Sequence, residues 1–501
     1  MESREYGMGV TAGAARVLLV GTGPLLASLA AALDASGFAD VQVRLTASSS
    51  GEAEPSWRES LGWAQWVWFG SCEEDREELL MLEEECRRAG KPLLPALIVR
   101  GTGMAGPLGD PSSGAGWEAV RRRVHRTALS EGGAPRADSF AEAMLANVLV
   151  SEWLKEVAEG GRSTLRDHVY LLDLETLEGR CHPFASPASG GRRFSPQPLE
   201  PGLLLQPASG DEEERDLFVV FGRLTSPVSG IFRLWDEGDL SQLPLSQCRV
   251  QTIDPLSEGF AELMPLAACA GLTHREARRE AGLAGIESYT ARLASSAELV
   301  SQPAEWTGIG AGGTVPEAFN RALRNGLARY MEKKKQPASR PSQIREWKIG
   351  AVRDAHCRFY GQTLAVMGGT PAVFEREDCL GFPSIWVRAG SRWYGGTGLN
   401  RTLALRMALQ RAIQDAQLRG AGTVTAECET TPADGEGDED EVPLLDVEET
   451  EEMNSVRLTA SALRILDANR VRLSIFDLAA EPFLKEEFGA VLGLLLEEGT
   501  E

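Results

Sequence analysis

The sequence predicts an α/β protein in two parts, an N-terminal doubly wound sheet and a C-terminal α+β region built on repeated glycine-led helices. Near the N-terminus, a buried strand, a glycine turn and a helix follow one another. Farther along, one helical frame is written twice. A chain of 501 residues is also too long for one ordinary core. We expect the first part at 1–150, a connector at 151–216 and the second part at 217–501.

Composition and charge narrow the function classes. With 43% hydrophobic and 25% charged residues, the chain can bury a substantial core. A net charge of −22 argues against nucleic acid or an anionic membrane as the main partner. No apolar run reaches about 18 residues and no signal peptide opens the chain, so we expect a cytoplasmic protein. The eight cysteines form no CxxC pair, which argues against a zinc site or a disulfide framework.

The N-terminal elements follow the order of a Rossmann-like fold. An apolar strand over 17–20 leads into a turn with Gly21 and Gly23, and apolar residues then recur at helical spacing over 25–33. A second strand is predicted at 41–45, and further strands lie within 63–71 and 91–101. This alternation is typical of a doubly wound sheet.

The glycine turn departs from a dinucleotide-binding fingerprint at two places. The third glycine is replaced by Leu26, and no acid ends the second strand in "VQVRLTASSS". We keep Gly21 and Gly23 as candidate cofactor-binding residues, beside the alternative that the turn serves packing alone. The stretch resembles the ThiF-like adenylating fold of ubiquitin-activating-type enzymes. The phosphate-handling arginine and lysine of that family have no secure match here.

The connector carries a second resemblance. The segment "RDHVYLLDLETLEGRCHPFASPASGGRRF" (166–194) opens as a strand, turns at 173–176 and resumes. It resembles the segment after the Rossmann part in ThiF-like partner proteins of azoline-forming cyclodehydratases. Those proteins present paired cysteines for zinc, whereas this chain has Cys181 and His182. One thiolate and one imidazole do not complete a tetrahedral site, so we predict no metal here.

The repeated frame is "GLTHREARREAGLAGIESY", which ends at Tyr289, and "GGTVPEAFNRALRNGLARY", which ends at Tyr330. Small residues four positions apart predict a smooth helical stripe that a neighbouring backbone can approach closely. The stripe in the first copy consists of Ala277, Ala281 and Gly285. Glu276 and Glu317 each stand three residues after a threonine, which predicts a capping box at both helix starts.

From residue 217 onward the chain resembles the YcaO family, the ATP-using half of azoline cyclodehydratases. The segment 222–250 matches the family's opening strands, 393–417 is similar to a third copy of the helix, and the C-terminal stretch is similar to its last strand, helix and strand. The resemblance implies an α+β YcaO-like domain that covers roughly 217–500.

The resemblance also implies carboxylates on these helices that hold the magnesium ions of ATP. In the first copy the two acidic positions fall on Ala284 and Glu287, in the second on Asn325 and Ala328, and in the third on Arg411. Glu287 is therefore the remaining candidate for cofactor binding, with a solvated or paired surface acid as the alternative. We predict no catalytic residue and no bound cofactor.

Three other segments invite interpretation. The basic stretch 328–348 is predicted to be a linker, with docking of an acidic leader peptide or of the chain's own acidic stretch as the alternative. The acidic stretch at about 427–453 is predicted to be a disordered loop. His356 and Cys357 are expected on a strand, where adjacent side chains point to opposite faces.

Together these features resemble thiazole-containing bacteriocin maturation proteins, which fuse a ThiF-like domain to a YcaO-like domain. The resemblance implies maturation of a ribosomally made thiazole- or oxazole-containing precursor peptide. Because both halves lack the catalytic pattern, we expect a scaffold that works with a cyclodehydratase and a dehydrogenase, with self-association as a further expectation. The alternative is an ATP- and magnesium-dependent cyclodehydratase or adenylating enzyme. A nicotinamide oxidoreductase would depend on Gly21 and Gly23 alone.

Overall fold

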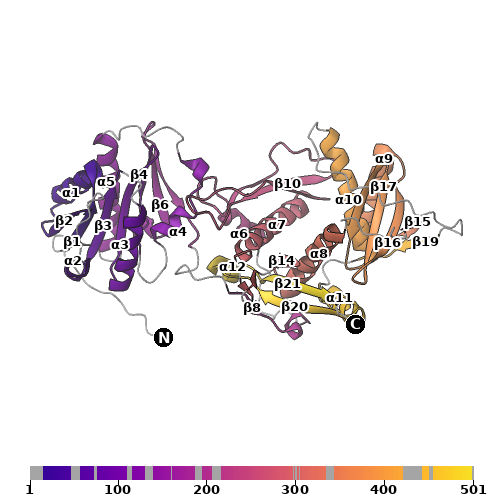
Figure 1. Cartoon of the computed structure of the whole chain (residues 1–501). Coiled ribbons are helices and arrows are strands. Elements are labelled where there is room, and N and C mark those ends of the chain that lie inside the picture. The colour runs from indigo at the N-terminus through magenta and orange to yellow at the C-terminus, as the bar shows by residue number, and fades with distance from the viewer. Residues whose placement is uncertain are drawn as a thin grey trace. The chain divides into compact units, whose positions relative to one another are not determined.

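The computed structural model describes residues 15–46, 57–72, 76–109, 116–129, 139–158, 161–186, 195–205, 216–296, 298–299, 302–303, 305–334, 344–420, 443–450 and 455–498. The chain forms two compact units (Figure 1). The first unit comprises Met1–Arg192, Leu224–Arg233 and Ile253–Met264. The second comprises Arg193–Arg223, Leu234–Thr252 and Pro265–Glu501. The polypeptide therefore passes between the units more than once.

A seven-stranded sheet forms the centre of the first unit, in the order β2-β1-β3-β4-β5-β6-β7. The first four strands in this order are parallel, and the remaining three are antiparallel to their neighbours. The strands are β1 (Val17–Gly21), β2 (Val41–Leu45), β3 (Trp66–Ser71), β4 (Leu93–Val99), β5 (Thr102–Ala105), β6 (His168–Asp173) and β7 (Gly179–Pro183). The helices are α1 (Gly23–Ala35), α2 (Trp57–Trp63), α3 (Arg76–Ala89), α4 (Trp117–Arg121) and α5 (Ser139–Val157).

Helices cover both faces of the parallel strands. Val17 and Leu19 of β1 belong to an apolar cluster with α1 and α5, whereas Leu18 and Val20 belong to a second cluster with α3. Successive residues of a strand point to opposite faces, so a strand buried on both faces must be apolar throughout. The doubly wound arrangement predicted from the sequence is confirmed for β1–β4.

The segment expected as a connector contributes strands to the first unit. Its residues 168–183 form the hairpin β6–β7, in which Leu171 pairs with Arg180. The turn predicted at 173–176 is confirmed, because Asp173 Oδ1 accepts hydrogen bonds of 2.9 Å from the amides of Glu175 and Thr176. β6 pairs with β5, so this hairpin extends the sheet.

The second unit contains several sheets. Their strand orders are β11-β10-β9, β14-β21-β20-β8, β18-β17-β16-β15-β19 and the short pair β12-β13. The strands are β8 (Gln197–Pro198), β9 (Phe232–Asp236), β10 (Ser246–Thr252), β11 (Ala267–Gly271), β12 (Glu298–Leu299), β13 (Gln302–Pro303), β14 (Gly308–Gly312), β15 (Ile344–Val352), β16 (Ala372–Cys379), β17 (Phe382–Ala389), β18 (Arg392–Thr397), β19 (Leu444–Val447), β20 (Val471–Asp477) and β21 (Ala490–Glu498). The helices are α6 (Leu217–Leu224), α7 (His274–Ala294), α8 (Val315–Lys334), α9 (Ala355–Gly368), α10 (Arg401–Gly420), α11 (Ser455–Ala468) and α12 (Pro482–Glu487).

Three strand–helix pairs share the repeated frame: β11 with α7, β14 with α8, and β18 with α10. The helices begin after Thr273, Thr314 and Asn400, and each of these side chains accepts a hydrogen bond from the amide three residues later. The predicted capping boxes are confirmed in α7 and α8, with one difference. Each glutamate carboxylate accepts from the amide just before the threonine, Leu272 N at 2.9 Å and Gly313 N at 3.0 Å.

The small-residue stripe of each helix lies directly on the preceding strand. A Cβ on Gly310 of β14 would stand 2.2 Å from Ala322 N, and one on Gly396 of β18 would stand 2.2 Å from Ala404 O. Such distances leave no room for any side chain. The repeated alanines and glycines are therefore required by backbone contact between a strand and the helix that follows it.

The C-terminal prediction is confirmed in its order, because β20, α12 and β21 form strand, helix and strand. The predicted acidic loop is wrong in part. Residues 443–450 are described, and within them β19 pairs in parallel with β15. Leu445 and Val447 are buried, and this apolar pair makes a strand favourable within an acidic stretch. Residues 421–442 and 451–454 lie outside the described part of the chain, as do 335–343 of the basic stretch.

We predict that Gly310→Ala destabilises the protein by about 1–3 kcal/mol, because the added methyl overlaps the backbone of α8. The control is Gly361→Ala in α9, where a Cβ meets nothing within 4 Å. This control should be stabilising by roughly 0.5–1 kcal/mol through helix propensity. Urea unfolding measures both, and equal midpoints for the two variants would refute the close approach.

Candidate functional site

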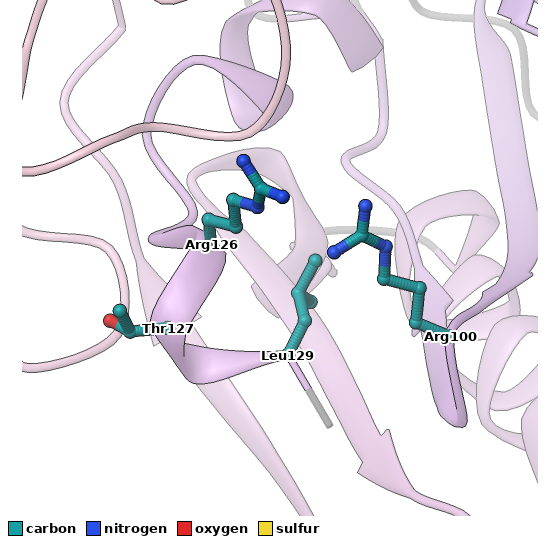
Figure 2. Close-up of a pocket in the computed structure, with 4 residues that line it drawn as sticks. All are labelled: Arg100, Arg126, Thr127 and Leu129. Carbon is teal, nitrogen blue, oxygen red and sulfur yellow. The ribbon is translucent and has the colours of Figure 1, made fainter. Parts of the chain in front are cut away.

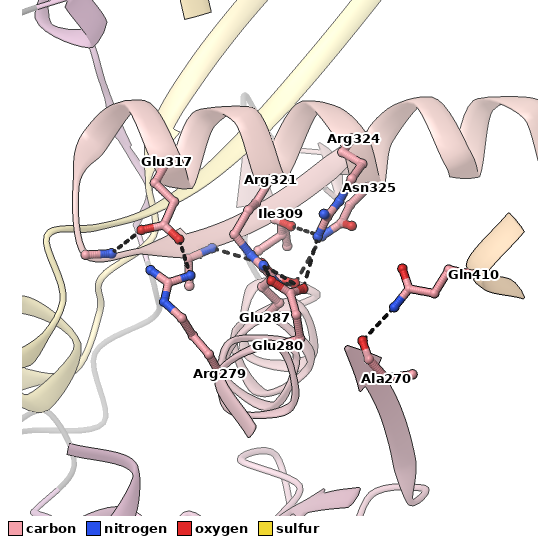
Figure 3. A network of polar contacts seen from close by, with 12 residues as sticks. Ala270, Arg279, Glu280, Glu287, Ile309, Glu317, Arg321, Arg324, Asn325 and Gln410 are labelled. Carbon is pink, nitrogen blue, oxygen red and sulfur yellow. Dashed lines mark hydrogen bonds and ion pairs between the residues drawn. The ribbon is translucent and has the colours of Figure 1, made fainter. Parts of the chain in front are cut away.

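The helices α7 and α8 are joined by a buried polar network, which we call the Arg321 network (Figure 3). It consists of Glu280 and Glu287 of α7 and of Arg321, Arg324 and Asn325 of α8. Arg321 is 7% exposed and Glu287 is 8% exposed. The network lies on the faces that the two helices turn toward each other, where the family resemblance would place metal-binding carboxylates.

Arg321 contacts both glutamates. Its Nε lies 2.6 Å from Glu287 Oε1 and its Nη2 lies 3.3 Å from Glu287 Oε2, so the ion pair is bidentate. Its Nη1 lies 2.8 and 2.9 Å from the two carboxylate oxygens of Glu280. The guanidinium therefore holds the two acids of α7 at once.

Each carboxylate oxygen of Glu287 also accepts a second hydrogen bond. Ala311 N of β14 donates to Oε1 at 3.2 Å, and Asn325 Nδ2 donates to Oε2 at 3.1 Å. The same amide nitrogen lies 2.9 Å from Ile309 O. Glu287 thus binds to α8 and to β14. The prediction that Glu287 is a paired acid is confirmed, whereas its expected surface position is wrong, because α8 and β14 cover the face of α7 that carries it.

Charges around the network are balanced. Glu280, Glu287 and the capping Glu317 contribute three negative charges. Arg321 and Arg324 pair with the first two glutamates, and Arg279 Nη1 lies 2.6 Å from Glu317 Oε1. Three guanidiniums therefore offset three carboxylates.

The arrangement does not fit magnesium, which needs several oxygen ligands that converge on an open point. In the described part of the chain, no group of three or more His, Cys, Asp or Glu side chains is placed to hold a metal ion. The oxygens of Glu287 accept from an arginine, an asparagine and a backbone amide. A cation would have to displace Arg321 from between the glutamates.

Electrostatic interactions keep both Glu280 and Arg321 ionised. Burial alone would raise the pKa of Glu280, but the guanidiniums of Arg321 and Arg324 outweigh burial and lower that pKa to about 2. Burial would likewise lower the pKa of Arg321, yet Glu280 and Glu287 raise it well above its ordinary value. Both charges therefore persist across the physiological pH range.

The position eleven residues after each cap shows why acids are absent there. Asn325 in α8 donates to Ile309 O, and Arg411 in α10 donates to Gly395 O at 2.7 Å. In both cases the acceptor is the carbonyl five residues before the cap. An acid would repel such a carbonyl, whereas an amide or guanidinium bonds to it. These residues therefore tie each helix to its own strand.

In α7 that position is Ala284, and α10 supplies the missing donor. Gln414 Nε2 lies 3.5 Å from Ala268 O. Gln410 Nε2 lies 2.6 Å from Ala270 O, as Figure 3 shows. Both carbonyls belong to β11, an outer strand of its sheet. The glutamines of α10 thus satisfy carbonyls on a strand edge that could otherwise pair with another chain.

In the first unit, the glycine turn serves close packing. Gly21 has a φ of +139°, and a Cβ there would stand 1.9 Å from Gly70 O. A Cβ on Gly70 would lie 2.5 Å from Leu29 Cδ1 and 3.5 Å from Leu26 Cα. β3 therefore supplies the close approach to α1 that the missing third glycine would give. Gly23, with a φ of +76°, meets nothing within 4 Å, and cofactor binding by these glycines stays a prediction.

A pocket of about 440 Å³ in the first unit is lined by Arg100, Arg126, Thr127 and Leu129 (Figure 2). Arg100 follows the carboxyl end of β4 and has a φ of +51°. Arg126 Nη1 lies 2.9 Å from Glu262 Oε1, and both of these side chains are more than half exposed. The pocket offers positive charge to an anion, in competition with Glu262.

Two histidine–cysteine neighbours are separate from these sites. Cys181 and His182 lie on β7, where Cys181 is exposed. His356 and Cys357 lie in the first turn of α9, so the predicted strand is wrong. Asp354 caps this helix by accepting from Cys357 N at 2.9 Å, and this bond favours a helix start. The buried Cys357 faces Thr402 O at 3.7 Å.

Sequence reasoning missed Glu280 and Arg321, the centre of the network. Both residues stand seven positions after their caps, so they occupy one position of the repeat with opposite charges. That reversal of sign was visible in the aligned copies. In the third copy the position is Met407, which has no charge to contribute.

We predict that Arg321→Ala lowers the free energy of unfolding by about 3–5 kcal/mol, because it leaves the buried Glu287 without its guanidinium partner. Arg324→Ala is the matched control, since Arg324 is 35% exposed and lies 3.5 Å from Glu280. It should cost less than about 1 kcal/mol. Millimolar magnesium should restore part of the stability of Arg321→Ala through the freed carboxylates. Urea unfolding of Arg321→Ala at the wild-type midpoint would contradict the prediction.

Acid should weaken the network in a defined pH window. Because the pKa of Glu280 is about 2 in the folded chain and 4.5 ordinarily, the unfolded chain takes up the proton first as the pH falls. The stabilisation is complete above pH 4.5 and is lost toward pH 2. Urea midpoints across this window should fall more steeply for the wild type than for Glu280→Gln. Parallel curves would show that Glu280 contributes nothing to the acid response.

No helix among the described residues is long and apolar enough to span a membrane.

No family model matches the chain, and no curated protein matches it. Solved structures match the chain in fold. A heterocyclase in complex with substrate and cofactor has a TM-score of 0.63 at 12% identity, over 98% of this chain and 81% of its own. The heterocyclase TruD has a TM-score of 0.55 at 15% identity, over 98% and 80%. E. coli MccB has a TM-score of 0.27 at 12% identity, over 34% of this chain and 62% of its own. The chain therefore shares the fold of the two heterocyclases over nearly its whole length.

Proposed function

We propose that this protein takes part in the maturation of a ribosomally made peptide whose Cys, Ser or Thr residues become azolines. In this proposal the first unit is a ThiF-like domain and the second unit a YcaO-like domain. The protein acts as a scaffold that presents the precursor to an active cyclodehydratase. The fold shared with two heterocyclases supports the chemical context.

One observation carries the scaffold role. The helix faces that would hold magnesium and ATP in a YcaO-like enzyme are occupied by the Arg321 network, in which every carboxylate has a guanidinium partner. A triphosphate would meet no bound cation there and would have to break buried ion pairs. Breaking such a pair is strongly unfavourable.

The proposed division of labour follows from that chemistry. Azoline formation requires attack of a side-chain thiol or hydroxyl on the preceding backbone carbonyl and removal of that carbonyl oxygen. We assign activation of the oxygen by ATP to the partner cyclodehydratase, and oxidation of the azoline to a dehydrogenase. The present chain supplies a rigid, charge-balanced fold and a docking surface.

A second candidate is an enzyme proper, and the Arg100–Arg126 pocket is the observation that favours it. Its two guanidiniums could hold a phosphate or carboxylate group, as an adenylating enzyme requires. The pocket belongs to the first unit, whereas the Arg321 network belongs to the second. The two candidates therefore place nucleotide binding at different residues.

Calorimetric titration with Mg·ATP tests the proposal, using the wild type, Glu287→Gln and Arg100→Met/Arg126→Met. The scaffold role predicts no saturable heat from any of these proteins. If the wild type binds Mg·ATP at micromolar concentration and Glu287→Gln does not, nucleotide binding lies at the YcaO-like site and the scaffold role is overturned. Binding that the double arginine variant abolishes would instead favour an adenylating enzyme. Circular dichroism of each variant controls for folding.

Reconstitution gives a positive test. An active cyclodehydratase and its precursor are incubated with and without the present chain, and the loss of water from the peptide is followed by mass spectrometry. A scaffold should increase the rate of water loss, and Glu287→Gln should retain this effect if it folds. No change in rate with the wild-type chain would count against the proposal.

A further inference from the structure

Two cysteines face each other across neighbouring strands of the second unit. Cys248 of β10 and Cys269 of β11 are direct partners in the antiparallel register, and both are free thiols. Residues that lie directly opposite in an antiparallel pair carry their side chains on the same face of the sheet. The strands therefore bring together two cysteines that are 21 residues apart in the chain.

The expected spacing suits a disulfide. Directly opposed residues have Cβ atoms about 4.5–5.5 Å apart. A disulfide needs about 3.5–4.5 Å between Cβ atoms and a Cα separation of about 4.4–6.8 Å, which the antiparallel ladder provides. A small local approach of the two strands is therefore sufficient, and no rearrangement of the fold is required.

The two thiols differ in their access to solvent. Cys248 is fully buried, whereas Cys269 is partly exposed on β11, an outer strand of its sheet. Burial raises the pKa of both thiols to about 12, so both are protonated at neutral pH and react slowly with an oxidant. An oxidant reaches Cys269 first, and Cys248 is placed to resolve the product.

We propose that Cys248 and Cys269 form a reversible cross-strand disulfide when the protein meets a peroxide. Hydrogen peroxide transfers one oxygen to Cys269 and gives its sulfenic acid and water. The sulfur of Cys248 then attacks the sulfur of that sulfenic acid and displaces a second water. In sum, two thiols and one peroxide become one disulfide and two waters, with both electrons taken up by the peroxide.

The position of this bond gives it a structural consequence. After Thr252 the chain leaves the second unit, contributes Ile253–Met264 to the first unit, and returns at Pro265. The disulfide would join the strands on either side of the segment Ile253–Met264. Cys269 also lies within electrostatic range of Glu280, Glu287 and Arg321, so oxidation changes a group beside the Arg321 network. The inference does not depend on the proposed function.

Peptide mapping of the full chain tests the proposal. The reduced protein is treated with hydrogen peroxide, denatured, alkylated without reduction and digested with trypsin. Cleavage after Arg249 places the two cysteines on the neighbouring peptides 234–249 and 250–275. We expect these peptides to be joined after peroxide treatment, and to separate when dithiothreitol is added.

Variants keep the assignment specific. Cys181→Ser removes an exposed thiol outside the pair and should leave the linked peptides unchanged. Cys248→Ser and Cys269→Ser should each abolish the link. The proposal is overturned if both wild-type peptides are recovered separately, if Cys269 accumulates as sulfinic acid, or if either peptide is joined to a different cysteine.

Discussion

The buried guanidinium of Arg321 is the interaction on which the second unit depends. It binds Glu280 and Glu287 of α7 from α8, and Glu287 in turn accepts from Ala311 N of β14. A charge in such a position is tolerated only while its partners remain, because desolvation of an unpaired carboxylate is costly. A divalent cation could also join two carboxylates, but it can dissociate. Arg321 is part of the chain, so this side-chain link between α7 and α8 needs no bound ion.

The repeated frame explains how the two helices come close enough for this contact. Glycines in β14 and β18 let the alanine stripes of α8 and α10 lie directly on the strands. Each cap then sets the rotation of its helix, so that equivalent positions point in equivalent directions. Glu280 and Arg321 occupy equivalent positions of the repeat, and they contact each other at 2.8 Å. The two helices therefore share their caps and their small residues but carry opposite charges at this position.

In the first unit, the glycine turn before α1 is likewise constrained by packing. The turn at Gly21 has the form of a nucleotide-binding loop, but its glycine is required by the backbone of β3 at Gly70. Close packing of α1, which such folds commonly obtain from a third glycine on the helix, comes here from the strand. In both units, close contacts within the chain itself meet the structural demand of the fold. The shared heterocyclase fold persists over 98% of the chain at 12–15% identity.

The sequence by itself determined the local features. Buried strands, glycine turns, the capping threonines at Thr273 and Thr314 and the four-residue alanine spacing depend on near neighbours, and all are seen in the structure. The tertiary structure alone decided the environment of Glu287, whose partners Arg321 and Asn325 lie 34 and 38 residues away. It also decided that 443–450 contains a strand, because that strand exists through pairing with the distant β15. Burial and charge pairing depend on contacts between remote segments, which no spacing within one segment reveals.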